Sequence, residues 1–198
     1  MPRPHVLVVD NGTLSLPQLC AVLDDLGTST TAVDTASVPS RLAGHHQAVV
    51  LSGTKVRAHD LGHYARLLDL LANTDVPVLG ICGGMQLLAV AAGGRLCPGP
   101  QRIGRSDVQV DTDEPLFAHV HPTVTLFQRH TLYLREAPQG FRVIGRSAQA
   151  PVEFLRSDDG RVMGSQSHLE FRPHGREILR GFTDFIERGP RASSGGRE

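Results

Sequence analysis

The chain has 198 residues, of which 40% are hydrophobic, and its 20 basic side chains are balanced by 20 acidic ones. This length suits one domain with its own core, and the balanced charge argues against nucleic acid or an anionic membrane as a partner. No apolar run approaches the ~20 residues of a membrane span, so no membrane association is expected.

The first half of the chain alternates strand patterns with helix patterns. Apolar runs without polar alternation predict strands that are covered on both faces of a parallel sheet. Ser15 and Gln18 resemble a capping box at the start of an amphipathic helix that Gly27 ends. The expected order is strand 5–9, helix 15–26, strand 30–33, strand 48–51, helix 61–71, a strand from residue 78 and a helix through residue 91.

After Gly94 the pattern changes to short strand candidates separated by polar turns. This spacing predicts antiparallel hairpins that extend the sheet, followed by one closing helix. We therefore expect an α/β fold: an open, mostly parallel, flavodoxin-like sheet with helices on both faces and an antiparallel β extension in the C-terminal half. The strand candidates are 108–110, 123–127, 141–144, 152–155 and 162–166; the helix is 178–186. A single domain is expected over 1–187, with a disordered tail at 188–198.

The cysteines divide into two ordinary residues and one in a special setting. Cys20, Cys82 and Cys97 form no CxxC pair, which favours a cytoplasmic location over disulfides and predicts no metal site. Cys82 stands between an apolar strand and a helix, flanked by Gly80 and Gly83, as in a nucleophile elbow. The positive end of the helix would favour a thiolate there, although a buried structural cysteine would give the same pattern.

A thiol nucleophile needs a base, and the base needs an orienting group. Most of the ten histidines, including His45 and His46, lie in polar or helical surface contexts. His168 follows a strand candidate, and Glu170 two residues later would point to the same side in extended backbone. Taken alone, such a pair is more often a surface pair than a catalytic dyad.

Two segments together resemble a known family. Gly80-Ile81-Cys82-Gly83-Gly84-Met85-Gln86 is similar to the nucleophile motif of class I glutamine amidotransferases, and the elbow itself is closer to that of GMP synthase amidotransferase domains than to that of the synthase subunits named below. Gly164-Ser165-Gln166-Ser167-His168-Leu169-Glu170 is similar to the His-x-Glu motif of the same family. Residues 10–27 and Arg129-His130-Thr131-Leu132 resemble anthranilate and aminodeoxychorismate synthase amidotransferase subunits, and Ser52-Gly53 matches the family's oxyanion strand.

The resemblance implies a role for each matching position. Cys82 would attack the side-chain amide of L-glutamine, His168 would move the proton, and Glu170 would hold the imidazole. The chemistry would run through a γ-glutamyl thioester without metal or cofactor and would feed ammonia to a separate synthase subunit. The backbone N–H groups of Gly53 and Gly83 would bind the oxyanion, and Gln86, Thr131 and Leu132 would hold the glutamine.

Three positions depart from the family pattern and keep other functions open. Thr54 stands where Gly or Pro is usual, Ser167 replaces an aromatic residue, and Leu169 replaces a proline beside the histidine. A self-sufficient γ-glutamyl hydrolase would share the elbow and triad. A catalytically silent regulatory subunit of the same fold would explain Thr54 and Leu169.

Overall fold

The computed structural model describes residues 3–54 and 60–189. Strands and helices alternate through the first half of the chain, as predicted. Of the predicted tail at 188–198, only the first two residues are described, and Arg188 is the last residue of the closing helix. The division into a domain at 1–187 and a tail stays a prediction.

The elements of the first half are β1 (His5–Asp10), α1 (Leu16–Asp25), β2 (Ser29–Asp34), the 3-10 helix η1 (Thr35–Ser37), β3 (His46–Leu51), α2 (Ala65–Ala72), β4 (Val78–Ile81) and α3 (Gly83–Ala91). Those of the second half are β5 (Leu96–Val110), the 3-10 helix η2 (Pro115–Phe117), β6 (Thr123–Leu134), β7 (Phe141–Arg146), β8 (Phe154–Ser157), β9 (Val162–Ser165) and α4 (Gly175–Arg188). No helix in the described ranges is long and apolar enough to cross a membrane.

One nine-stranded sheet runs in the order β2-β1-β3-β4-β9-β8-β7-β5-β6. The first five strands in this order are parallel, and the remaining pairings are antiparallel. The expected parallel sheet with an antiparallel extension is therefore confirmed. The placement of β9 among the appended hairpins was wrong in part, because β9 pairs antiparallel with β8 but parallel with β4.

Strand β5 is much longer than the predicted 108–110. Its first residues include Pro98, Gly99 and Pro100, and its side chains up to Asp107 are exposed or half-buried, so the sequence carries little strand signal there. Pairing with β6 holds this stretch extended instead. Tertiary contact overrides local propensity at such positions.

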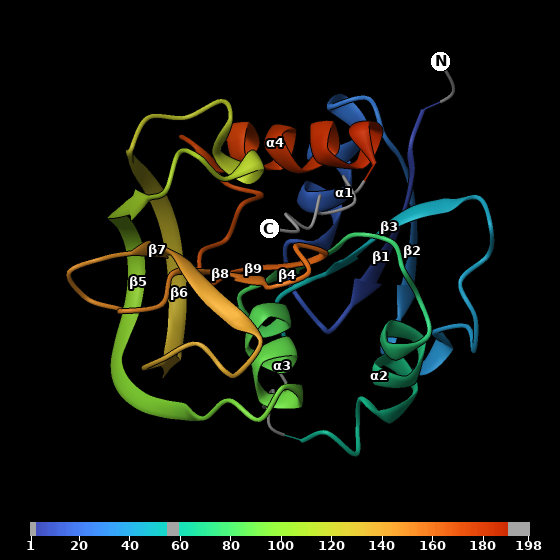
Figure 1. The fold of residues 1–198 in the computed structure, drawn as a ribbon, viewed down its shortest axis with the longest axis horizontal. Coiled ribbons are helices and arrows are strands. Elements are labelled where there is room, and N and C mark those ends of the chain that lie inside the picture. The colour runs from blue at the N-terminus through green and yellow to red at the C-terminus, as the bar shows by residue number, and fades with distance from the viewer. Residues whose placement is uncertain (1–2, 55–59, 190–198) are drawn as a thin grey trace, which may run out of the picture.

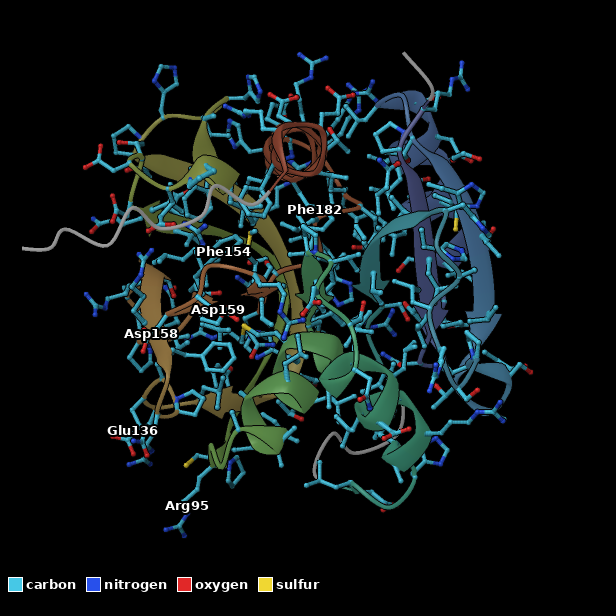
Figure 2. All side chains as sticks on the ribbon, turned by 45° about the vertical axis from the view of Figure 1, so that its right-hand side comes forward. Arg95, Glu136, Phe154, Asp158, Asp159 and Phe182 are labelled. Carbon is cyan, nitrogen blue, oxygen red and sulfur yellow. The ribbon has the colours of Figure 1, made fainter. Side chains whose placement is uncertain are left out.

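The core lies in two layers, one on each face of the parallel strands. Val6 and Val8 of β1 pack in the cluster that includes α1 and α4, whereas Leu7 and Val9 pack with α2 and α3. Figure 1 shows α1 and α4 on one side of the sheet and α2 and α3 on the other. Figure 2 shows Phe182 of α4 directed into the interior, while Arg95 and Glu136 extend outward.

The carboxyl ends of the parallel strands form the part of the fold where a ligand site is expected. The parallel strands β1, β3 and β4 end beside one another at Asp10, Leu51 and Ile81. Ligands in open α/β sheets bind beyond these carboxyl ends. The residues that follow the three strands therefore meet at one place.

Candidate active site

Cys82 occupies a strained turn between β4 and α3. Its φ of 50° and ψ of −108° make it the only non-glycine residue with positive φ among the described residues. Its backbone N–H donates to the carbonyl of Ser165 at 2.6 Å, which ties the turn to the end of β9. Such strain persists only where surrounding contacts enforce it, and it concentrates at functional sites.

The glycine after Cys82 is required by close packing. A Cβ at Gly83 would lie 2.2 Å from Cγ2 of Thr54, far inside van der Waals contact. Gly83 is the first residue of α3, where the backbone N–H groups have no partner within the helix. The turn therefore brings free amides beside the sulfur. Thr54 itself does not have positive φ, and its hydroxyl lies 2.8 Å from the hydroxyl of Tyr64.

His168 lies between the thiol and a carboxylate. Its Nδ1 is 2.8 Å from Oε1 of Glu170, and the ring and the thiol of Cys82 line the same cavity. Both His168 and Glu170 are buried, with 8% and 4% of their surface exposed. The sequence motifs thus come together in space, although their spacing along the chain is 86 residues from Cys82 to His168 (168 − 82).

The sequence predicts that His168 and Glu170 pair in extended backbone. The structure shows a different local geometry. Strand β9 ends at Ser165, His168 forms an isolated bridge with Phe127, and Glu170 lies in a turn. The backbone N–H of His168 donates to the carbonyl of Phe127 at 2.9 Å. This bond to β6 braces the histidine where the family's usual proline is replaced by Leu169, which is fully buried in the core.

His168 and Glu170 each favour the charged form of the other. Burial alone would lower the pKa of His168, but its hydrogen bonds to Cys82 and Glu170 and their negative charges raise that pKa to about 10. Burial would raise the pKa of Glu170, yet the bond and charge of His168 and the bond from Ser15 lower it overall. The favoured state of His168 is therefore an imidazolium paired with the carboxylate of Glu170.

Ser15 is a member of the site that the sequence did not reveal. Its hydroxyl donates to Oε1 of Glu170 at 2.5 Å and makes no capping bond to α1, so the predicted capping box was wrong. The hydroxyl instead supplies its hydrogen to the buried carboxylate, which needs donors to offset the cost of its burial. Asp10 holds this loop by accepting from the backbone N–H groups of Gly12 and Thr13.

We expect Ser15→Ala to lower kcat/KM for glutamine by roughly tenfold to a hundredfold, because a hydrogen bond to a charged group contributes about 1.5–3 kcal/mol. Without this donor the pKa of Glu170 should rise, so the acidic limb of the pH–rate profile should move to higher pH. Steady-state kinetics from pH 4 to 8 measure both effects. Ser40→Ala, at an exposed serine, is the matched control. An unchanged acidic limb would contradict a role for Ser15 at Glu170.

A cavity of about 310 Å³ opens directly over the sulfur. Gly53 forms part of its wall, and a Cβ there would lie 3.3 Å from Cε1 of His168 and 3.9 Å from Cβ of Cys82. The full lining is Gly12, Thr13, Leu14, Ser15, Gly53, Thr54, Cys82, Phe127, Arg129, His168 and Phe171. This volume is at the small end of the range for ligand pockets, which suits a small substrate.

The three residues predicted to hold glutamine do not line this cavity. The buried amide of Gln86 donates to the carbonyl of Leu132 at 2.9 Å and to Oε1 of Gln166 at 3.1 Å. Thr131 is exposed. The segment 129–132 contacts the site through its backbone instead: the carbonyl oxygen of Arg129 lies 3.8 Å from Sγ of Cys82. A role for these residues in substrate binding stays a prediction.

A buried polar network backs the site and accounts for another departure from the family pattern. Nε2 of Gln166 lies 3.8 Å from the sulfur, a contact that the sequence did not indicate. Ser167 accepts a hydrogen bond from Gln128 at 2.7 Å, and the same amide donates to Glu153. Burial raises the pKa of Glu153. Burial also lowers the pKa of His130 to about 4, and Nε2 of His130 lies 3.0 Å from Oε1 of Gln128. Ser167 thus has a partner that an aromatic side chain would lack.

Comparison with known proteins agrees with the motifs. The model of the family "Glutamine amidotransferase class-I" matches residues 7–185. A glutamine-hydrolysing GMP synthase subunit of Natronomonas pharaonis is 33% identical over 185 residues, which cover 91% of this chain and 96% of the relative. The glutamine-hydrolysing GMP synthase of Clostridium perfringens is 38% identical over 113 residues, or 56% of this chain, but the match spans only 22% of that longer protein.

Solved structures give the same result. A protein of Thermoplasma acidophilum, described as a candidate subunit of a GMP synthase, superposes with a TM-score of 0.86 at 25% identity, covering 94% of this chain and 95% of that one. A glutamine amidotransferase of Thermotoga maritima superposes with a TM-score of 0.74 at 21% identity, covering 94% and 85% of the two chains. The second likeness shows the fold alone.

Proposed function

The chain belongs to the class I glutamine amidotransferase family, and on that premise we propose that it hydrolyses L-glutamine to glutamate and ammonia through a thioester on Cys82. The observation that carries this proposal is that Cys82 and His168 line one small open cavity, with Glu170 hydrogen-bonded to Nδ1 of His168 behind it. A nucleophile, a base and an orienting group in reach of one another are what acyl transfer requires.

In the proposed reaction the thiolate of Cys82 attacks the side-chain carbonyl carbon of glutamine. The carbonyl oxygen becomes an oxyanion, which accepts hydrogen bonds from the backbone N–H groups of Gly53 and Gly83; one such donor is worth roughly 2.7–4 kcal/mol. His168 gives its proton to the departing nitrogen, and ammonia leaves as the thioester forms. Water then attacks the thioester while His168 takes its proton, and release of glutamate restores the thiolate.

The ammonia is proposed to pass to a separate synthase subunit. The support is the near full-length match to a relative named as one subunit of a glutamine-hydrolysing GMP synthase, together with the match of a longer GMP synthase over only part of its length. A GMP-forming partner is therefore the first acceptor to test. A cytoplasmic location for this pair stays a prediction from the cysteine pattern.

The test is glutamate release by the isolated protein and by its mixture with the GMP synthase partner subunit from the same organism. We expect slow hydrolysis alone and an increase of at least roughly tenfold with the partner, because unpartnered hydrolysis would waste glutamine. Full turnover without the partner would overturn this gating. Equal cleavage of other γ-glutamyl amides would favour the hydrolase alternative. Failure of diazo-oxo-norleucine, a glutamine-mimicking electrophile, to label Cys82 would favour the silent regulatory role.

A further inference from the structure

Three histidines gather at the amino ends of the parallel strands, whereas Cys82 lies beyond their carboxyl ends. His5 begins β1 and His46 begins β3, and the two are register partners in neighbouring parallel strands, with His45 immediately before. One side-chain nitrogen from each residue lies within 4.8 Å of the other two. The ring centroids are 4.2–5.0 Å apart. Because the six residues of β1 span roughly 16 Å, this cluster is remote from the thiol.

The burial of His46 was not expected, since the sequence placed it in a surface context. Only 9% of its surface is exposed, and neither Nδ1 nor Nε2 has a hydrogen-bond partner among the described residues. A buried polar atom without a partner is costly and calls for an explanation, such as an ion. The side chain of His46 faces two other imidazoles rather than apolar residues alone.

The geometry points to a binding site for a divalent transition metal ion, with zinc as the best match, formed by His5, His45 and His46. Three imidazoles and one water make a tetrahedral zinc site, in which ligand nitrogens lie roughly 3.3 Å apart at the usual Zn–N distance. The ring of His45 is exposed, which leaves it room to turn toward the other two imidazoles when an ion binds. Nε2 of His5 lies 2.8 Å from the hydroxyl of Thr31, which leaves Nδ1 as its ligand atom and supplies an orienting partner.

The inferred ion would tie the amino end of β1 to the amino end of β3 and stabilise that part of the sheet. It takes no part in glutamine hydrolysis and does not depend on the proposed function. The prediction of no metal site rested on the cysteine pattern, which indicates only thiolate ligands. An adjacent pair of histidines and a third one 40 residues earlier in the chain form a different ligand set.

The experiment is a calorimetric titration of the metal-free, full-length protein with zinc chloride, in a Cys82→Ala background so that the active-site thiol does not compete. We expect one ion per chain, bound at micromolar zinc, and a zinc-dependent rise in Tm. His45→Ala should weaken binding at least roughly tenfold and remove the rise in Tm. Because His45 is exposed, this variant should fold normally, which circular dichroism checks.

His121→Ala serves as the matched control, because His121 is an exposed histidine away from the cluster. It should bind zinc as the parent does. Two results would overturn the site: no saturable binding by the parent, or equal affinity in the parent and in His45→Ala. Neither result bears on glutamine hydrolysis, which is measured separately with intact Cys82.

Discussion

Cys82→Ala is expected to lower glutamine hydrolysis by roughly 10⁴-fold or more, to the limit of detection, because the substitution removes the proposed thiol nucleophile. The cavity, the proposed oxyanion donors and the His168–Glu170 pair would all remain. The measurement is glutamate formation with a coupled dehydrogenase, together with mass spectrometry after treatment with diazo-oxo-norleucine. The wild-type protein should gain one covalent adduct, and the variant none.

Cys97→Ala is the matched control for this substitution. Cys97 is a half-buried free thiol in β5 and does not line the cavity over the sulfur. It should leave both the rate and the adduct unchanged. Thermal unfolding checks that the Cys82 variant is folded, and alanine keeps the Cβ that this turn already accommodates. Residual activity within tenfold of wild type in a folded Cys82→Ala protein would rule out the thioester mechanism.

Glu170→Gln is expected to lower kcat/KM by roughly 10³-fold, in line with the large effect of replacing the acidic member of a comparable triad. The amide would keep the size of the side chain but lose the charge that holds the imidazolium. Since Glu170 and Cys82 raise the pKa of His168 to about 10, removing one of them should lower it toward its ordinary value near 6.5. The imidazolium would then be lost at lower pH.

The pH–rate profile tests this cause directly. In the wild-type protein the alkaline limb should lie well above pH 8, because His168 keeps its proton until the pH approaches its raised pKa. In Glu170→Gln the same limb should move down by at least one pH unit. Glu136→Gln, at an exposed glutamate, is the control and should leave the profile unchanged. An unmoved alkaline limb in Glu170→Gln would contradict the assignment of Glu170 as the partner of His168.

The parallel half of the fold could be predicted because its signal is local. Runs such as 5–9 and 48–51 are apolar on both faces, and the observed strands place alternate residues of β1 in two different core layers. The turn at Cys82 was equally readable, since its glycines stand within two residues of the cysteine and a Cβ at Gly80 would clash with Gly84 in the same turn. The spacing of buried residues along a strand and the need for glycine in a tight turn are both properties of short segments, so they can be recognised in the sequence.

The sequence by itself therefore determined the strand–helix alternation, the thiol on a strained turn and the His-x-Glu motif. Only the tertiary structure decided that Ser15 donates to Glu170 from 155 residues away, that β9 enters the parallel sheet, and that His46 is buried beside His5. These contacts join segments whose separation is fixed by the packing of the whole sheet. No local pattern of residues specifies which distant segment will lie beside it, because the sequence of each segment would be the same with a different neighbour.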